Sequence, residues 1–126
     1  MQITSLTIRL TFLGGAFGTL ARFLLLMGFG DLPSVVFVNI LGAALIGWLN
    51  GNKEYDTDAH NALWKIGFAG GFTTMSSFAA LIVLYTQGIG WITIGLALLI
   101  TGLGLGAYWF AFKISRANSS RGSARA

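Results

Sequence analysis

Four long apolar runs with very few charges inside them dominate this chain of 126 residues. Charged residues make up 10% of the chain, whereas soluble domains carry roughly 25%. A helix that crosses a membrane needs about 20 consecutive apolar residues. The chain is therefore predicted to be an all-α membrane protein with four transmembrane helices, at approximately Leu10 to Phe29, Val35 to Leu49, Leu63 to Tyr85 and Ile89 to Phe112.

Four spans leave no room for a soluble domain beside them. We predict one four-helix transmembrane unit over residues 1–115 and a polar, disordered C-terminal tail over residues 116–126, rich in Ser, Arg and Ala. The first run contains Arg22 and lacks a small-residue cleavage pattern, so we expect it to be retained as a span.

Enzymatic and redox chemistry find few suitable residues in this sequence. The chain has no cysteine, which excludes disulfides, iron–sulfur clusters and thiolate chemistry. Its one histidine, His60, lies in a polar loop with Glu54, Asp56 and Asp58, and we interpret these residues as a solvated connector rather than a metal site. We expect no catalysis.

Glycines four residues apart recur in three of the apolar runs. Small residues at this spacing let two helix backbones approach closely. The pairs are Gly14 with Gly18, Gly67 with Gly71, and Gly102 with Gly106. We interpret the first and last pairs as ordinary helix packing.

The third apolar run carries three glycines and four hydroxyl residues between Gly67 and Phe78. This composition fits a helix that breaks at mid-membrane and releases backbone carbonyls, which is tolerated only where the carbonyls are buried in protein or coordinate an ion. It equally fits a kinked helix in which Ser and Thr bond back to the backbone. Spacing alone does not separate the two.

Three short motifs in this chain resemble those of a known protein family. The sequence GGFTTMSSF at 70–78 resembles the GGxTTFSTF signature in the third helix of the Fluc/CrcB fluoride channel family. The glycine-rich sequence from Gly14 to Phe23, which contains Arg22, resembles the first-helix pattern of this family, and VNILG at 38–42 resembles its VNxxG. The motifs occur in the family order and cover most of the chain.

The resemblance implies an antiparallel dimer with two narrow anion pores, a structural Na⁺ at the subunit interface, and passive export of fluoride that gives fluoride resistance. It assigns the Na⁺ to Gly71 and Thr74, whose carbonyls a broken helix would supply. It places Asn39 and Ser76 in the fluoride pathway as hydrogen-bond donors, together with Phe78, whose ring edge is positively polarised.

This sequence departs from the family pattern at two positions. Met75 stands where the family has the first of two pore phenylalanines, and Leu81 stands where it has an acidic residue. Arg22 is open to two interpretations, since it could draw anions into a vestibule or snorkel to the headgroups.

Two other functions remain as alternatives, a small four-helix multidrug transporter and a non-conducting partner or assembly subunit. A proton-coupled transporter needs a carboxylate inside the membrane. The acidic residues of this chain all lie outside the four apolar runs: Asp31, Glu54, Asp56 and Asp58.

The basic residues predict the orientation in the cell membrane. With four spans, both termini and the polar loop lie on one side, which holds Arg9, Lys53, Lys65, Lys113, Arg116, Arg121 and Arg125. The positive-inside rule then predicts a multi-pass protein of the cell inner membrane with both termini in the cytoplasm. The net charge of +4 thus reflects orientation and not nucleic-acid binding. Because so biased a chain inserts one way, an antiparallel dimer favours a separately encoded homologous partner, with a homodimer as the alternative.

Overall fold

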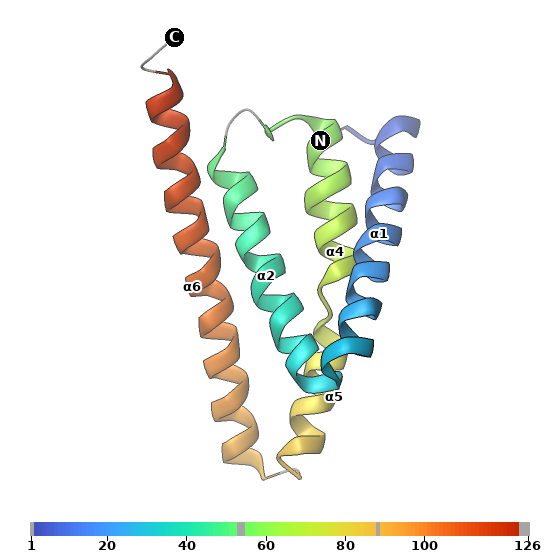
Figure 1. The fold of residues 1–126 in the computed structure, drawn as a ribbon, viewed down its shortest axis with the longest axis vertical. Coiled ribbons are helices and arrows are strands. Elements are labelled where there is room, and N and C mark those ends of the chain that lie inside the picture. The colour runs from blue at the N-terminus through green and yellow to red at the C-terminus, as the bar shows by residue number, and fades with distance from the viewer. Residues whose placement is uncertain (1, 53–54, 88, 124–126) are drawn as a thin grey trace.

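The computed structural model describes residues 2–52, 55–87 and 89–123, and every regular element within them is helical. Four helices among these residues are long and apolar enough to cross a membrane (Figure 1). They are α1 (Ser5–Phe29), α2 (Asp31–Gly51), a composite third span, and α6 (Gly90–Ser123). The predicted all-α fold with four spans is thus confirmed, whereas the dimer stays a prediction.

The third span is assembled from four consecutive pieces. These are α3 (Asp58–His60), the π-helix η2 (Asn61–Phe68), α4 (Ala69–Phe72) and α5 (Met75–Tyr85). The two residues between α4 and α5, Thr73 and Thr74, have extended backbones. The structure therefore favours the broken helix over the merely kinked one.

The last helix is longer than its apolar run. Helix α6 continues through Ser123, so the structure has helix over residues 116–123, where the sequence predicts a disordered tail. Residues 124–126 lie outside the described residues, as do Lys53 and Glu54 of the polar loop.

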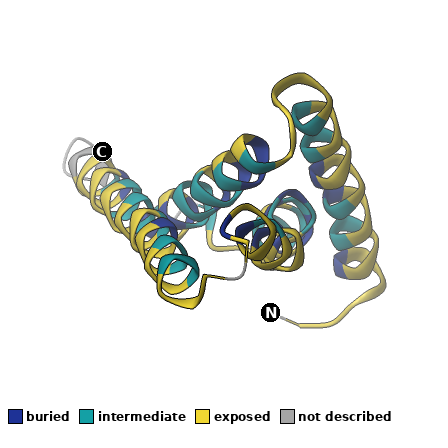
Figure 2. Cartoon of the chain, turned by 90° about the horizontal axis from the view of Figure 1, so that it is seen from below, coloured by how far each residue is buried: buried dark blue, intermediate teal, exposed yellow. Residues whose placement is uncertain are grey.

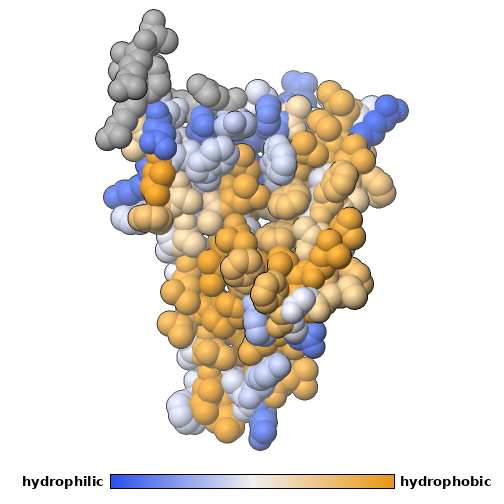
Figure 3. Space-filling view, viewed as in Figure 1, coloured by the Kyte–Doolittle hydropathy of each residue, from blue (hydrophilic) through white to orange (hydrophobic). Residues whose placement is uncertain are grey.

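The helices form two pairs that meet near the break. Helix α2 packs along α6, and α1 packs along η2 and α4. Figure 1 shows the two pairs diverging toward the end of the molecule that holds both termini. On the face seen in Figure 3, apolar residues cover most of the middle of the molecule and hydrophilic residues gather at that same end.

Helix α1 buries small residues and exposes large ones. The buried residues of α1 are Thr7, Gly14 and Gly18, while Phe12 and Phe17 on the same helix are 76% and 62% exposed. Buried positions in Figure 2 likewise lie where helices face one another. This pattern is expected for helices whose outer faces contact lipid or another subunit, because lipid tails are as apolar as the side chains they touch.

Glycines set the close approach within both pairs. A Cβ at Gly14 would lie 2.1 Å from the Leu63 carbonyl oxygen, and a Cβ at Gly71 would lie 2.3 Å from that of Gly15. The prediction of close backbone approach is confirmed for the pairs in α1 and the third span. For Gly102 and Gly106 it is wrong within the described chain, since a Cβ there meets nothing within 4 Å. Helix α6 instead packs with its backbone on Gly47 and Gly51 of α2.

Candidate functional site

The break in the third span is built by two adjacent threonines. The hydroxyl of Thr73 donates over 2.8 Å to the Ala69 carbonyl, which also accepts the Thr73 backbone N–H at 3.0 Å. The hydroxyl oxygen of Thr74 accepts the Ser77 amide over 3.3 Å and caps the start of α5. The Thr74 hydroxyl thus caps the start of α5, while the Thr73 hydroxyl bonds back to its own helix, so the sequence TT ends one helix and starts the next without leaving either hydroxyl unpaired.

Two side chains from other helices hold the break in place. Asn39 on α2 makes two hydrogen bonds to the Thr74 backbone, accepting its N–H on Oδ1 at 2.8 Å and donating from Nδ2 to its carbonyl at 3.0 Å. Arg22 on α1 donates from its guanidinium to the Thr73 carbonyl at 3.0 Å. Backbone groups released by a break at mid-membrane need such partners, since no water is available there.

The VNILG sequence places two residues against this break. Asn39 and Gly42 are three residues apart and so share a helix face. A Cβ at Gly42 would lie 2.2 Å from the Thr73 methyl group. Gly42 therefore makes the room that Thr73 needs while Asn39 binds the next residue.

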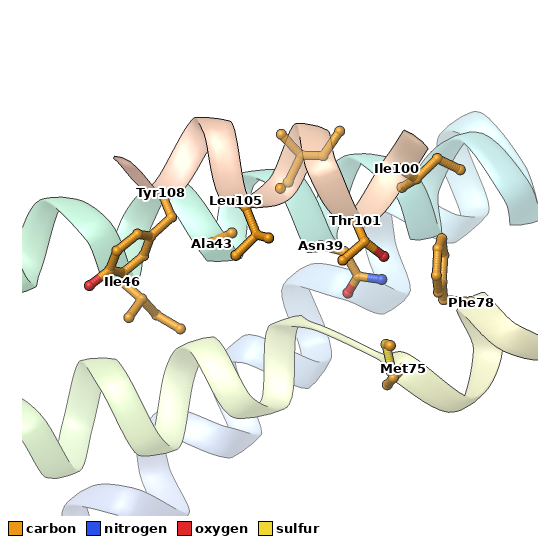
Figure 4. Close-up of a pocket in the computed structure, with 11 residues that line it drawn as sticks. Asn39, Ala43, Ile46, Met75, Phe78, Ile100, Thr101, Leu105 and Tyr108 are labelled. Atoms are coloured by element: carbon orange, nitrogen blue, oxygen red, sulfur yellow. The ribbon is translucent and has the colours of Figure 1, made fainter. Parts of the chain in front are cut away.

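A cavity of about 300 Å³ opens beside the break, between α2, α5 and α6 (Figure 4). The predicted residues Asn39, Met75 and Phe78 all line it. Phe78 is 5% exposed, whereas Met75 is 71% exposed at the open side. The remaining lining residues are mostly apolar: Ile40, Ala43, Ile46, Ile100, Thr101, Gly104, Leu105 and Tyr108.

The other predicted site residues lie apart from the cavity. Ser76 is exposed on α5 and is not among the lining residues. Arg22 contacts the break from the α1 side instead of reaching toward the membrane surface. Thr101 and Tyr108 also line the cavity and are not predicted from the sequence, although a hydroxyl in the middle of the last apolar run is a usable signal.

The carbonyls predicted to bind a cation lie on either side of the break. The Gly71 oxygen accepts only a long 3.4 Å bond from the Thr19 hydroxyl, and the Thr74 oxygen accepts the amide of Asn39. A carbonyl has two lone pairs, so each of these oxygens can still bind a hard cation such as Na⁺. Two oxygens are too few for a cation site, which would need further ligands from outside this chain.

The polar loop forms its own small network. Asp56 accepts a hydrogen bond from the Asn61 amide at 3.1 Å and lies 3.6 Å from the Lys65 ammonium. The Asn61 hydrogen bond and the Lys65 charge lower the pKa of the Asp56 carboxyl below its usual value. Within residues 2–52, 55–87 and 89–123, no three His, Asp or Glu side chains are grouped as a metal site would require.

The chain matches the sequence model of a family described as "CrcB-like protein, Camphor Resistance (CrcB)" over residues 9–112. It is 36% identical over 117 residues to "Fluoride-specific ion channel FluC 2" of Synechococcus sp. (strain CC9605), which covers 92% of this chain and 86% of the relative. It is 33% identical over 106 residues to "Fluoride-specific ion channel FluC" of Salmonella arizonae, with 72% of this chain and 80% of the relative covered. No solved structure gives a significant match.

Proposed function

This chain belongs to the CrcB family, whose named members are ion channels and not enzymes, and we propose that it is a subunit of a fluoride-specific channel in the cell membrane. The resemblance expected from the three sequence motifs is thereby confirmed at the level of the family.

The proposal rests on one observation: Asn39 and Phe78 line the same cavity, whose other lining residues are mostly apolar. Fluoride is small and strongly hydrated, so a pathway must replace its water with donors while remaining narrow. The Asn39 amide uses one N–H on Thr74 and has a second to offer. The edge of the Phe78 ring presents the positive part of its quadrupole.

The exposed positions on α5 fit a pathway that a second subunit completes. Met75 and Ser76 are both exposed at the open side of α5. In an antiparallel dimer, the partner subunit would cover them and bring the Ser76 hydroxyl next to the anion. One guanidinium nitrogen of Arg22 donates a hydrogen bond to the Thr73 carbonyl. The remaining N–H groups of Arg22 would attract anions toward the break.

A structural Na⁺ fits the carbonyls of Gly71 and Thr74. Each subunit supplies two oxygens, and a partner related by a two-fold axis would supply two more. The ion would fix two broken helices against each other by its charge. Asn39 would help to orient the Thr74 carbonyl toward it.

Transport through such a pathway is passive. The acidic residues Asp31, Asp56 and Asp58 lie at or beyond the ends of the spans, so no carboxylate in the described spans is available to couple fluoride to protons. Fluoride therefore leaves the cell down its own gradient. The multidrug transporter is disfavoured for the same reason.

The experiment is efflux from loaded liposomes, with the protein reconstituted alone and with a homologous partner. We expect dissipation of a fluoride gradient and almost none of a chloride gradient. Phe78→Ile should abolish fluoride efflux, whereas Phe110→Ile, at a 64% exposed position on α6, should not. Equal chloride efflux would overturn the fluoride assignment, and wild-type efflux from Phe78→Ile would show that the anion takes another route.

A second candidate, a non-conducting partner subunit, is favoured by one observation. Met75 replaces an aromatic ring at the cavity with a thioether, which offers no comparable positive edge. If this subunit conducts only through pores lined by its partner, Phe78→Ile in this chain should leave efflux from the heterodimer unchanged.

A further inference from the structure

The C-terminal part of α6 carries a stripe of aromatic and cationic side chains that the proposed channel function does not use. Trp109, Lys113 and Arg116 follow one another at helical spacings of four and three residues, which places them on one face. All three are exposed. We name this set the α6 cationic stripe.

The stripe faces away from the bundle. Ser115 on the opposite face of α6 is 2% exposed, and its Cβ lies against Gly51 of α2. Residues 109, 113 and 116 are rotated from Ser115 by roughly 100° to 160° at 100° per residue. Trp109 and Lys113 therefore point outward, whereas Arg116 lies at the edge of the face that packs on Gly51 of α2, with its side chain exposed.

Contacts along the stripe leave both charges available. The Lys113 ammonium lies over the Trp109 ring, 3.9 Å from its centroid. The Arg116 guanidinium lies 5.8 Å from the Phe112 centroid. Among residues 2–52, 55–87 and 89–123, neither cation has a carboxylate partner. Aromatic contact orients a cation without consuming its hydrogen-bond donors.

The depth of the stripe matches the headgroup layer of a bilayer. Tryptophans gather at membrane interfaces, and Trp48 lies at the same level as Trp109 because Gly47 packs on the Tyr108 backbone. Lys113 lies about 6 Å and Arg116 about 10 Å beyond Trp109 along the helix. The headgroup region begins at the tryptophan level and is roughly 5 to 8 Å deep on each side. The Lys113 backbone lies within this layer, whereas the Arg116 backbone lies just beyond it, and the long Arg116 side chain reaches back into it because helical side chains tilt toward the N-terminus.

We propose that the α6 cationic stripe binds the phosphate of an anionic membrane lipid. Lys113 and Arg116 would contact the phosphate, Arg116 by two parallel N–H donors, and Trp109 would lie along the start of the acyl chains. A lipid satisfies charge, depth and direction together. A soluble acidic partner would satisfy only the charge.

The test measures which lipid lies next to Trp109. Trp48, Trp64 and Trp91 are replaced by Phe, and the protein is reconstituted in mixtures of phosphatidylglycerol and phosphatidylcholine. One lipid at a time is brominated on its acyl chains, so that it quenches Trp109. We expect brominated phosphatidylglycerol to quench better, corresponding to about fivefold local enrichment per cation, and the preference to vanish in about 0.5 M salt.

Two variants test whether lipid binding depends on the α6 cationic stripe or on any positive charge at this end of the molecule. Lys113→Gln with Arg116→Gln should bring the ratio of the two quenching values to one. Lys65→Gln removes a cation at the same end that is paired with Asp56, and it should leave the ratio unchanged. Taking the ratio within each variant cancels any change that Lys113 itself makes to Trp109 fluorescence.

A second measurement uses the protein with all four tryptophans. Native mass spectrometry should find phosphatidylglycerol retained by the wild type and lost from the double variant. Equal quenching by both lipids, or retention unaffected by the double substitution, would overturn the proposal. The former result would indicate that the stripe faces water or a protein. Neither measurement depends on fluoride transport, so the channel function stands or falls separately.

Discussion

Asn39, which we propose as a pathway residue, also has a structural role. Its amide pairs with both backbone groups of Thr74, as the edge of a β-strand would. The bond to Arg22 holds the preceding carbonyl. The pathway residue proposed from the motif thus also helps to hold the break in place. One of its two N–H donors binds the Thr74 carbonyl, so only one remains for an anion.

Replacing Asn39 with leucine should therefore affect stability as well as transport. The change leaves the Thr74 N–H and carbonyl without their partner, which costs about 1 to 3 kcal/mol for a buried group. We expect a lower thermal midpoint in detergent and no fluoride efflux. Asn50→Leu is the control, because Asn50 is exposed near the end of α2 and bonds only the Tyr108 hydroxyl. An unchanged midpoint for Asn39→Leu would contradict the structural role.

Met75→Phe tests the departure from the family pattern. Because Met75 is 71% exposed, a phenyl ring fits without overpacking. A ring edge at the cavity should preserve fluoride efflux or raise it a few-fold, on the order of 1 kcal/mol. Met27→Phe on α1 is a matched control at 73% exposure and should change nothing. Loss of efflux in Met75→Phe alone would mean that the thioether is fitted to a particular neighbour.

At the scale of elements, glycine positions decide which helices pair. Gly14 and Gly18 bring α1 onto the third span, while Gly47 and Gly51 bring α2 onto α6. Gly102 and Gly106 have the same spacing, yet a Cβ added at either would meet nothing within 4 Å in the described chain. The spacing of small residues therefore indicates a face that can pack, but not the helix that packs on it.

Alanine substitutions at two of these glycines should have opposite effects. At Gly14 a methyl group would overlap the Leu63 carbonyl, and since backbone cannot move aside cheaply, we expect a loss of about 2 kcal/mol or more. At Gly102 the space is open, so Ala should be neutral or stabilise the helix by up to about 1 kcal/mol. Thermal unfolding of both variants in detergent measures the difference. Equal midpoints would show that α1 does not pack as described.

In the molecule as a whole, the cavity between α2, α5 and α6 is open on the side where Met75 lies. The exposed Met75 lies at this opening, and the described chain supplies too few oxygens to complete a cation site. Both termini lie at the end where the hydrophilic residues gather (Figures 1 and 3). Arg9, Lys65, Lys113 and Arg116 belong to that end, while Lys53 and Arg125 lie outside the described residues.

We expect this subunit to need an oppositely oriented homologous partner, because its charges favour one orientation. In fluoride-sensitive cells that lack their own exporter, rescue should require co-expression of a neighbouring homologous gene. Reporter tags at the C-terminus should be found only in the cytoplasm. Full rescue by this gene alone, with tags on both sides of the membrane, would establish a dual-topology homodimer instead.

Local chemistry determined much of this protein without reference to its fold. Hydropathy is a property that each residue carries by itself, so the four spans and their order follow from sequence alone. The break at Thr73 and Thr74 was only partly determined in this way, because the glycines and hydroxyl residues there fit a broken and a kinked helix equally, and the extended backbones of the two threonines in the structure favour the break.

Only the tertiary structure decided which distant residues meet. Asn39 and Thr74 are 35 positions apart, and Arg22 and Thr73 are 51 apart. Whether these residues meet depends on which helix faces pack on each other. In a membrane, hydrophobicity alone does not select those faces, because lipid contacts an apolar face as favourably as protein does. Close backbone packing at Gly14 and Gly47 selects the faces that pair in this protein. The packing of α6 on Gly47 also places Thr101 and Tyr108 beside the cavity.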